Sequence, residues 1–451
     1  MKKLLICFLA FLLGASLCGC IPTGGGDDDD YDPSKDWVKF SGLDIEGARA
    51  LVTWPGQVGA DNVDVHKLYK LTQDAKLVEV FPLDNRGNKI DINFMPIEIY
   101  NVNDNYLLIS NSNDWGGNSQ GTYLVEKSNG RVTKIPRDAG FPAYHLVDRK
   151  NRGKVVQTDD SGNIYYIGND MNDRVGERIV KLTTGAGVRH EYISKKSVKY
   201  FRVDQYGNVM YYNYLYDDHT YWLNQKEISI AEEIFHNCFT RDEELYLMTK
   251  NDEDQLKVWP VSEDGFLSDS FTPISSDSDF MKASKLDYWN PQLINIDDYI
   301  YFLRDTSLDY EIYELDSDNN LKNISGVIKG ELSRIFSYDY TDSALYFVGL
   351  NTSQESTIVK YTPNSEAIEE TYNLSKYNIE PPSHKHHQTI IALGNGDVLF
   401  QGTLVDNEFQ YVLSIANQEG VRVVAEAPAD YMDIYKDPHI VCERMGFSVT
   451  D

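Results

Sequence analysis

Three histidines that lie close together, His384, His386 and His387, are the residues of this chain best suited to metal chemistry. Glu380 precedes them, and imidazole nitrogens with a carboxylate are ligands that zinc and other transition metals accept. The three histidines are therefore the candidate metal ligands. The competing interpretation is a solvated loop, because the segment follows two prolines and Lys385 would repel a bound cation. Ligand spacing alone is a weak signal for a metal site, so the loop is favoured.

Two polar segments, residues 84–88 and 159–163, have the Asp, Asn and Gly content of calcium-binding loops. Calcium requires about six to eight oxygen ligands, and neither segment has the glutamate that closes such a loop. Turn formation therefore explains both. For hydrolysis, the sequence has no Gly-x-Ser-x-Gly nucleophile motif, and any carboxylate pair chosen among its 70 acidic residues would be arbitrary. We predict no catalytic residue and no cofactor, and the sequence favours a binding protein over an enzyme.

Aromatic side chains are the candidates for ligand contact. The densest stretch, residues 211–222, includes Tyr216 and Trp222. Aromatic rings beside carboxylates can stack on sugars or form a protein-binding hot spot, although alternation along a strand would bury half of them. Trp115 lies in the polar loop 111–121, among turn residues outside any expected strand, and is expected to be exposed. We take Trp115, Tyr216 and Trp222 as candidate ligand-binding residues.

The formal net charge of −28 limits the partners. A chain this acidic is unsuited to nucleic acid and to docking on anionic lipid through a basic patch. Neutral or cationic partners, either proteins or glycans, fit the charge.

The elements that must position these residues are short strands separated by turns, with no convincing amphipathic helix after residue 37. Residues 155–167 form one hairpin: a strand, a turn of Asp, Ser, Gly and Asn, and a strand rich in aromatic residues. Similar hairpins recur at residues 99–109, 201–212, 239–248, 294–303, 338–348 and 390–401. Each is followed by a second hairpin, at residues 68–80, 123–135, 179–192, 221–228, 256–266, 313–321, 358–372 and 412–424.

Two hairpins make a unit of four strands, and the units begin about 40 to 55 residues apart, the period of propeller blades. We predict an all-β fold, a β-propeller with eight four-stranded blades, and seven blades remain the alternative. The inner hairpin of the eighth blade is either the weak segment 40–52 or the tail 432–443, which would close the ring by pairing the two ends of the chain. The sequence has no WD dipeptide, kelch or Asp-box motif that would assign a propeller family.

The N-terminus directs the protein to the cell envelope. Two lysines and a short apolar run form a secretory signal that is too short to span a membrane comfortably. The run ends in Leu17-Cys18-Gly19-Cys20, which resembles the bacterial lipobox, and this resemblance implies that Cys20 is lipidated. An ordinary cleaved signal is the alternative. We expect a signal peptide over residues 1–19, a flexible Gly- and Asp-rich tether over 20–36 and a propeller over 37–451. Removal of Lys2 and Lys3 leaves 40 basic and 70 acidic residues, a net charge near −30.

The lipobox and the repeats together resemble bacterial lipid-anchored propellers. This resemblance implies a monomeric binding or scaffolding module for a protein or glycan, anchored through Cys20 to the outer membrane. Periplasmic and surface exposure are both open, because the acidic run 27–30 lies further from Cys20 than in typical surface-export signals. The alternative function is a polysaccharide-cleaving propeller enzyme, a glycosidase or lyase, with carboxylates or the three histidines converging in the axial funnel. Cys238 and Cys442 either pair in a disulfide or remain free thiols.

Overall fold

The computed structural model divides the chain into two units, Met1–Lys39 and Phe40–Asp451. It describes residues 40–55, 66–90, 94, 96–112, 119–136, 139, 141–142, 156–169, 177–184, 187–195, 197–215, 218–230, 233–253, 255–274, 292–296, 298–305, 310–341, 343–365, 367–381, 390–394, 396–405, 410–427 and 442–444. Within these ranges, no helix has the length and apolar character needed to cross a membrane.

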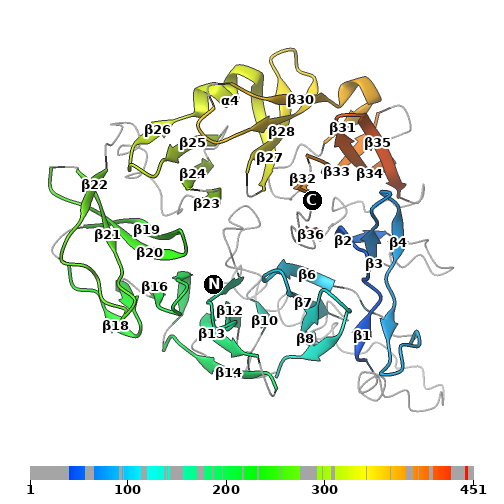
Figure 1. Cartoon of the computed structure of the whole chain (residues 1–451). Helices are drawn as coiled ribbons and strands as arrows, with labels where there is room; N and C mark the ends of the chain where they lie inside the picture. The colour runs from blue at the N-terminus through cyan, green and yellow to red at the C-terminus, as the bar shows by residue number, and fades with distance from the viewer. Residues whose placement is uncertain are drawn as a thin grey trace, which may run out of the picture. The chain divides into compact units, whose positions relative to one another are not determined.

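The second unit is an eight-bladed β-propeller. Eight antiparallel sheets follow one another around a ring in chain order (Figure 1). We call the four strands of each sheet A to D, from the innermost to the outermost. Blades 1 to 4 consist of β36 (Cys442–Arg444), β2 (Ala50–Pro55), β3 (His66–Leu71) and β4 (Leu77–Glu79); β6 (Pro96–Asn101), β7 (Tyr106–Ser112), β8 (Ser119–Glu126) and β9 (Val132–Lys134); β10 (Phe141–Pro142) with β11 (Val156–Thr158), β12 (Ile164–Asn169), β13 (Glu177–Thr183) and β14 (Arg189–Tyr192); and β15 (Val198–Val203), β16 (Val209–Leu215), β17 (Asp218–Leu223) and β18 (Lys226–Glu227).

Blades 5 to 8 have the same order. They consist of β19 (Glu233–Arg241), β20 (Glu244–Lys250), β21 (Leu256–Pro260) and β22 (Thr272–Ile274); β23 (Gln292–Ile296), β24 (Tyr299–Asp305), β25 (Tyr310–Leu315) and β26 (Leu321–Asn323); β27 (Leu332–Tyr340), β28 (Leu345–Asn351), β29 (Ser356–Tyr361) and β30 (Glu370–Asn373); and β31 (Ile379–Glu380) with β32 (Ile390–Ala392), β33 (Val398–Leu404), β34 (Gln410–Asn417) and β35 (Gly420–Glu426). In blades 3 and 8, strand A is made of two short pieces that both pair with strand B.

The chain closes the ring with its C-terminal strand. β36 pairs with β2, with Val52 opposite Cys442 and Ala50 opposite Arg444. Two segments were the alternatives for the remaining inner strand, and the tail is the one that supplies it, as strand A of blade 1. Residues 40–52 do not, because residues 50–55 are strand B of the same blade.

Successive side chains of strand B point to opposite faces of the sheet, and this explains why the sheets pack as blades. In blade 3, Ile164 and Tyr166 pack against blade 2, whereas Tyr165 and Ile167 pack against blade 4. Both faces of the sheet are thus apolar, and burial of each large side chain contributes about 1.5–3 kcal/mol. Comparable clusters join each later pair of blades and join blade 8 to blade 1.

Strand A also approaches strand B closely at irregular points. In blade 7, a Cβ on Gly349 would collide with the carbonyl oxygen of Arg334, where β27 departs from regular register. Only glycine fits such a crossing.

Residues 40–43, the first that the structure describes, run along the outside of blades 1 and 2, and we call them the strap. β1 (Gly42–Leu43) pairs with β5 (Pro82–Leu83), and Leu43 N donates to Gly130 O at 2.8 Å on the other side. The ring of Phe40 packs against Phe94 and Tyr123, each at 5.3 Å between ring centroids. The chain therefore enters the propeller at the rim between blades 1 and 2.

Two local details differ from the sequence expectation. The short helix α4 (Ser325–Glu331) and the 3₁₀ turn η2 (Ser375–Tyr377) lie in connections where no helix is predicted. In blade 5, the partner of β21 is β22 rather than residues up to 266, so a loop lies between the two strands. That loop carries two exposed phenylalanines, Phe266 and Phe271.

Candidate binding surface

Five-residue turns with one recurring geometry close many of the hairpins. In blade 4, Asp204 accepts two hydrogen bonds from Asn208, from its backbone N at 2.7 Å and from Nδ2 at 2.8 Å. Asp159 and Asn163 form the same pair in blade 3. In both, the fourth residue is a glycine with a positive φ. Both segments with calcium-like sequences, residues 84–88 and 159–163, thus form turns in which the aspartate accepts hydrogen bonds from amide groups.

Burial decides whether the pKa of the aspartate that begins such a turn is lowered or raised. The turn that begins at Asp84 is exposed, and its hydrogen bonds from Asn88 lower the pKa of the Asp84 carboxyl. The turn that begins at Asp204 is packed between blades, and burial raises the pKa of the Asp204 carboxyl despite similar hydrogen bonds. Asp204 is 2% exposed. The same motif is thus a surface turn in one blade and part of a blade interface in another.

Asn208 joins two blades. Its Nδ2 donates to Ser262 O at 3.3 Å and to Glu263 O at 3.1 Å, both in the turn between strands C and D of blade 5. Its Oδ1 accepts from Asn224 Nδ2 at 2.7 Å, and Asn224 in turn accepts from Val209 N. One buried amide therefore holds three turns together.

Gly265 permits this close contact. Its φ is +72°, and a Cβ there would stand 2.1 Å from Asn224 Nδ2 and 2.5 Å from Asn208 Oδ1. Any side chain at this position would push the blade 5 turn away from blade 4.

Two exposed rings lie on these joined turns. Tyr206 is 48% exposed, and its hydroxyl donates to Glu263 Oε1 at 3.0 Å. Phe266 is 59% exposed, and Lys226 Nζ lies 5.0 Å from its ring centroid. We use "turn surface" for the four turns 204–208, 224–226, 242–244 and 262–266. Its two rings are held by neighbours from both blades, so the surface is preorganised for contact.

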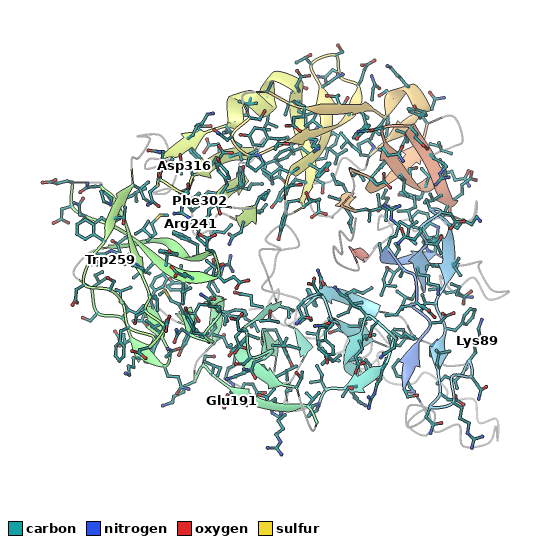
Figure 2. All side chains as sticks on the ribbon, viewed as in Figure 1. Lys89, Glu191, Arg241, Trp259, Phe302 and Asp316 are labelled. Atoms are coloured by element: carbon teal, nitrogen blue, oxygen red, sulfur yellow. The ribbon has the colours of Figure 1, made fainter. Side chains whose placement is uncertain are left out.

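Backbone hydrogen bonds also join the turns of neighbouring blades. Gln205 N donates to Glu243 O at 3.0 Å, and Asp160 N donates to Gln205 O at 2.9 Å, which joins the A–B turns of blades 3, 4 and 5. Arg241 then reaches blade 6, donating to Asp316 O and to Asn319 Oδ1 at 3.0 Å each. Figure 2 labels both Arg241 and Asp316 near this border.

A second aromatic group lies on blade 5. Trp259 lies toward the outer edge of the blade (Figure 2) and contacts Phe271 at 5.0 Å between ring centroids. Phe271 is 43% exposed, and Lys257 Nζ lies 4.2 Å from its ring centroid. Of the six large apolar side chains that are exposed among the described residues, three are Tyr206, Phe266 and Phe271. Blades 4 and 5 therefore carry the main exposed apolar surface of the described chain.

Acidic side chains surround the two rings of the turn surface. Asp242, Glu243, Glu244, Glu263 and Asp264 are all exposed there. Burial, followed by the charge and the hydrogen bond of Asp298, raises the pKa of the Asp242 carboxyl. The hydrogen bond to Glu263 raises the pKa of the Tyr206 hydroxyl. Neighbouring carboxylates add to both shifts, after burial for Asp242 and after the hydrogen bond for Tyr206.

Most of the site residues predicted from the sequence lie outside the described residues: Cys20, Trp115, Tyr216, His384, His386 and His387. The three histidines fall between β31 and β32, the two pieces of strand A in blade 8. Within the described part of the chain, no group of three or more His, Cys, Asp or Glu side chains could hold a metal ion.

Trp222 is described and half-buried. Its ring stacks on Tyr211 at 6.3 Å between centroids and 8° between planes, and its Nε1 donates to Thr220 Oγ1 at 3.0 Å. The tryptophan thus packs against its own sheet on the side of blade 3. Its role in ligand binding stays a prediction.

Sequence reasoning missed Tyr206, Phe266 and Phe271. A signal was present, because all three are large aromatic residues in segments otherwise made of turn residues. Cys238 is a buried free thiol rather than half of a disulfide.

The comparisons with known proteins add no family. No protein-family model matches the chain, and no curated protein matches its sequence. Among solved structures, a putative 6-phosphogluconolactonase from Bacteroides uniformis ATCC 8492 is 12% identical, with a TM-score of 0.35 over 72% of this chain and 95% of that chain. The WD40 domain of SCAP from fission yeast is 9% identical, with a TM-score of 0.34 over 85% and 86%. TolB from Acinetobacter baumannii is 10% identical, with a TM-score of 0.30 over 72% and 78%. The propeller fold rests on the order of the sheets. The similarity to 6-phosphogluconolactonase-like and WD40 propellers is distant, and no activity follows from it.

Proposed function

We propose that this protein is an envelope lipoprotein whose propeller is a binding module for a macromolecular partner, a protein or a glycan. The observation that carries the proposal is the pair of exposed rings, Tyr206 and Phe266, on turns that hydrogen bonds lock together across two blades. Exposed aromatic side chains held in one orientation are typical of binding hot spots, because little conformational entropy is lost on contact.

Photocrosslinking in intact bacterial cells tests the binding function. A photoreactive phenylalanine analogue replaces Tyr206 in one variant and Tyr377, an exposed tyrosine near blade 8, in a control. We expect position 206 to yield a crosslinked protein or glycan species that position 377 does not. The proposal fails if both positions give the same products or none.

Fractionation tests the anchor separately. The wild-type chain is expected in the outer-membrane fraction and to incorporate labelled fatty acid, whereas Cys20→Ala is expected to lose the label and the membrane association. A Cys18→Ala control should retain both. A Cys20→Ala chain that remains lipidated contradicts the assignment of Cys20.

A further inference from the structure

The exposed rings of the turn surface are available to cationic groups. The negative face of an aromatic ring attracts ammonium and guanidinium groups within about 6 Å. The chain already uses this property: Lys226 lies over Phe266 and Lys257 over Phe271. Tyr206 has a comparable exposed ring, which Glu263 holds through the tyrosine hydroxyl.

The charges around the rings have the complementary sign. Five exposed carboxylates, on Asp242, Glu243, Glu244, Glu263 and Asp264, stand on the turn surface, where Lys226 is the one lysine or arginine that is exposed. Like charges held this close repel one another, so the surface disfavours further negative charge. An incoming cation would relieve the repulsion, and an anionic ligand would increase it.

We infer that the turn surface binds a basic polypeptide segment, with lysine or arginine side chains over the rings of Tyr206 and Phe266 and ion pairs to Glu263 and Asp264. The inference rests on the proposed binding function and names its partner class. Aliphatic parts of the lysine or arginine side chains would cover the rings, and their charged ends would reach the carboxylates. A glycan would use the rings without needing the charge, and it is the alternative that the test must separate.

The test measures affinity on the full chain in detergent, with fluorescein-labelled nona-arginine as the probe. Nona-glutamate serves as the anionic control and neutral oligosaccharides as the glycan control. We expect nona-arginine to bind, with an affinity that falls as salt is raised, and the other two not to bind. Tyr206→Ala should weaken binding about tenfold, the size of a partly desolvated cation–π contact. Tyr206→Phe, which keeps the ring, should weaken it less.

Two matched variants separate this surface from the general acidity of the protein. Glu263→Gln should weaken binding several-fold, whereas Glu419→Gln, an equal change of charge on an exposed turn of blade 8, should not. Lys226→Ala should strengthen binding, because it removes a competing ammonium group from Phe266. Thermal melts check that each variant is folded.

The outcomes discriminate among the possibilities. Equal binding by Tyr206→Ala, Glu263→Gln and Glu419→Gln would mean general electrostatic attraction and overturns the inference. Binding of a neutral oligosaccharide that Tyr206→Ala abolishes also overturns it, but leaves the proposed binding function intact. No binding of any probe, together with no crosslink at position 206, would contradict both the inference and the proposed binding function.

Discussion

The side-chain oxygen of Asn208 and the backbone of Gly265 stand so close that a methyl group on Gly265 would lie 2.5 Å from Oδ1. This contact fixes the separation of blades 4 and 5 where the turn surface is built. Gly265→Ala is therefore expected to destabilise the protein by about 1–3 kcal/mol, because of overpacking and a strained positive φ. Denaturant unfolding measures the change.

Gly326 provides the matched control. It lies in α4, and a methyl group added to it would meet no atom within 4 Å beyond its chain neighbours and the backbone of its own helix. Gly326→Ala should therefore be neutral or stabilise by up to about 1 kcal/mol through helix propensity. Equal stability of the two variants would contradict the close packing at Asn208.

A buried carboxylate joins blades 6 and 7. Glu314 is 3% exposed and accepts from Tyr301 Oη at 2.6 Å, Tyr361 Oη at 3.0 Å and Asn364 N at 3.1 Å. Glu314→Ala leaves Tyr301 Oη and Asn364 N without this acceptor and Tyr361 Oη with only Ser365 O at 3.3 Å, and it should cost about 2–4 kcal/mol of stability. Glu331→Ala, which removes an exposed glutamate at the end of α4, should change stability little. A small effect at Glu314 would show that the two tyrosines are not held by it.

The neighbouring carboxyl groups of Asp242 in blade 5 and Asp298 in blade 6 should make stability depend on pH. The raised pKa of Asp242 means that the folded state binds this proton more tightly than the unfolded state. Its contribution is favourable below the unfolded pKa, near 4, and is lost as the pH rises through the folded pKa. Arg241 opposes the shift, whereas Asp298 and Glu244 enhance it.

Asp298→Asn should therefore stabilise the protein at pH 7 and change it little at pH 3. Allowing for solvent screening at this exposed site, the gain is about 0.5 kcal/mol. Unfolding curves at both pH values measure the difference, with Glu419→Gln as a control expected to show none. A gain of equal size at pH 3 would mean that the effect is not electrostatic.

The thiol of Cys238 should be unreactive in the folded protein. Burial raises its pKa to about 12, and its Sγ lies 3.8 Å from Met210 O. In a Cys442→Ser background at pH 8, iodoacetamide is expected to label Cys238 only on the timescale of unfolding. Labelling at the rate of a small free thiol in the absence of denaturant would contradict its burial between blades 4 and 5.

The sequence predicts the repeated part of the fold well, because each hairpin has a local signal. Residues 155–167 show two strands and a turn from Asp159 to Asn163, and the structure has that hairpin. Closure of the ring has no local signal in the sequence, because β36 and β2 are separated by almost the whole chain. The sequence alone therefore leaves two alternatives for the last inner strand.

The turn surface was beyond sequence analysis for the same reason. Phe266 and Tyr206 are separated by many residues, and only the packing of blade 5 against blade 4 places them on one surface. Trp222 shows the opposite case: its aromatic stretch stands out in the sequence, but its ring is held against Tyr211 within one blade.

Hydrogen exchange of the full chain, with and without nona-arginine, tests most directly whether the joined turns of blades 4 and 5 are where the partner binds. We predict slower exchange in residues 204–208 and 262–266, and unchanged exchange around Tyr377 and in the strap at β1. The same peptide added to Tyr206→Ala should give much weaker protection of the same turns. Protection confined to other blades, or spread evenly over the acidic surface, would contradict the account.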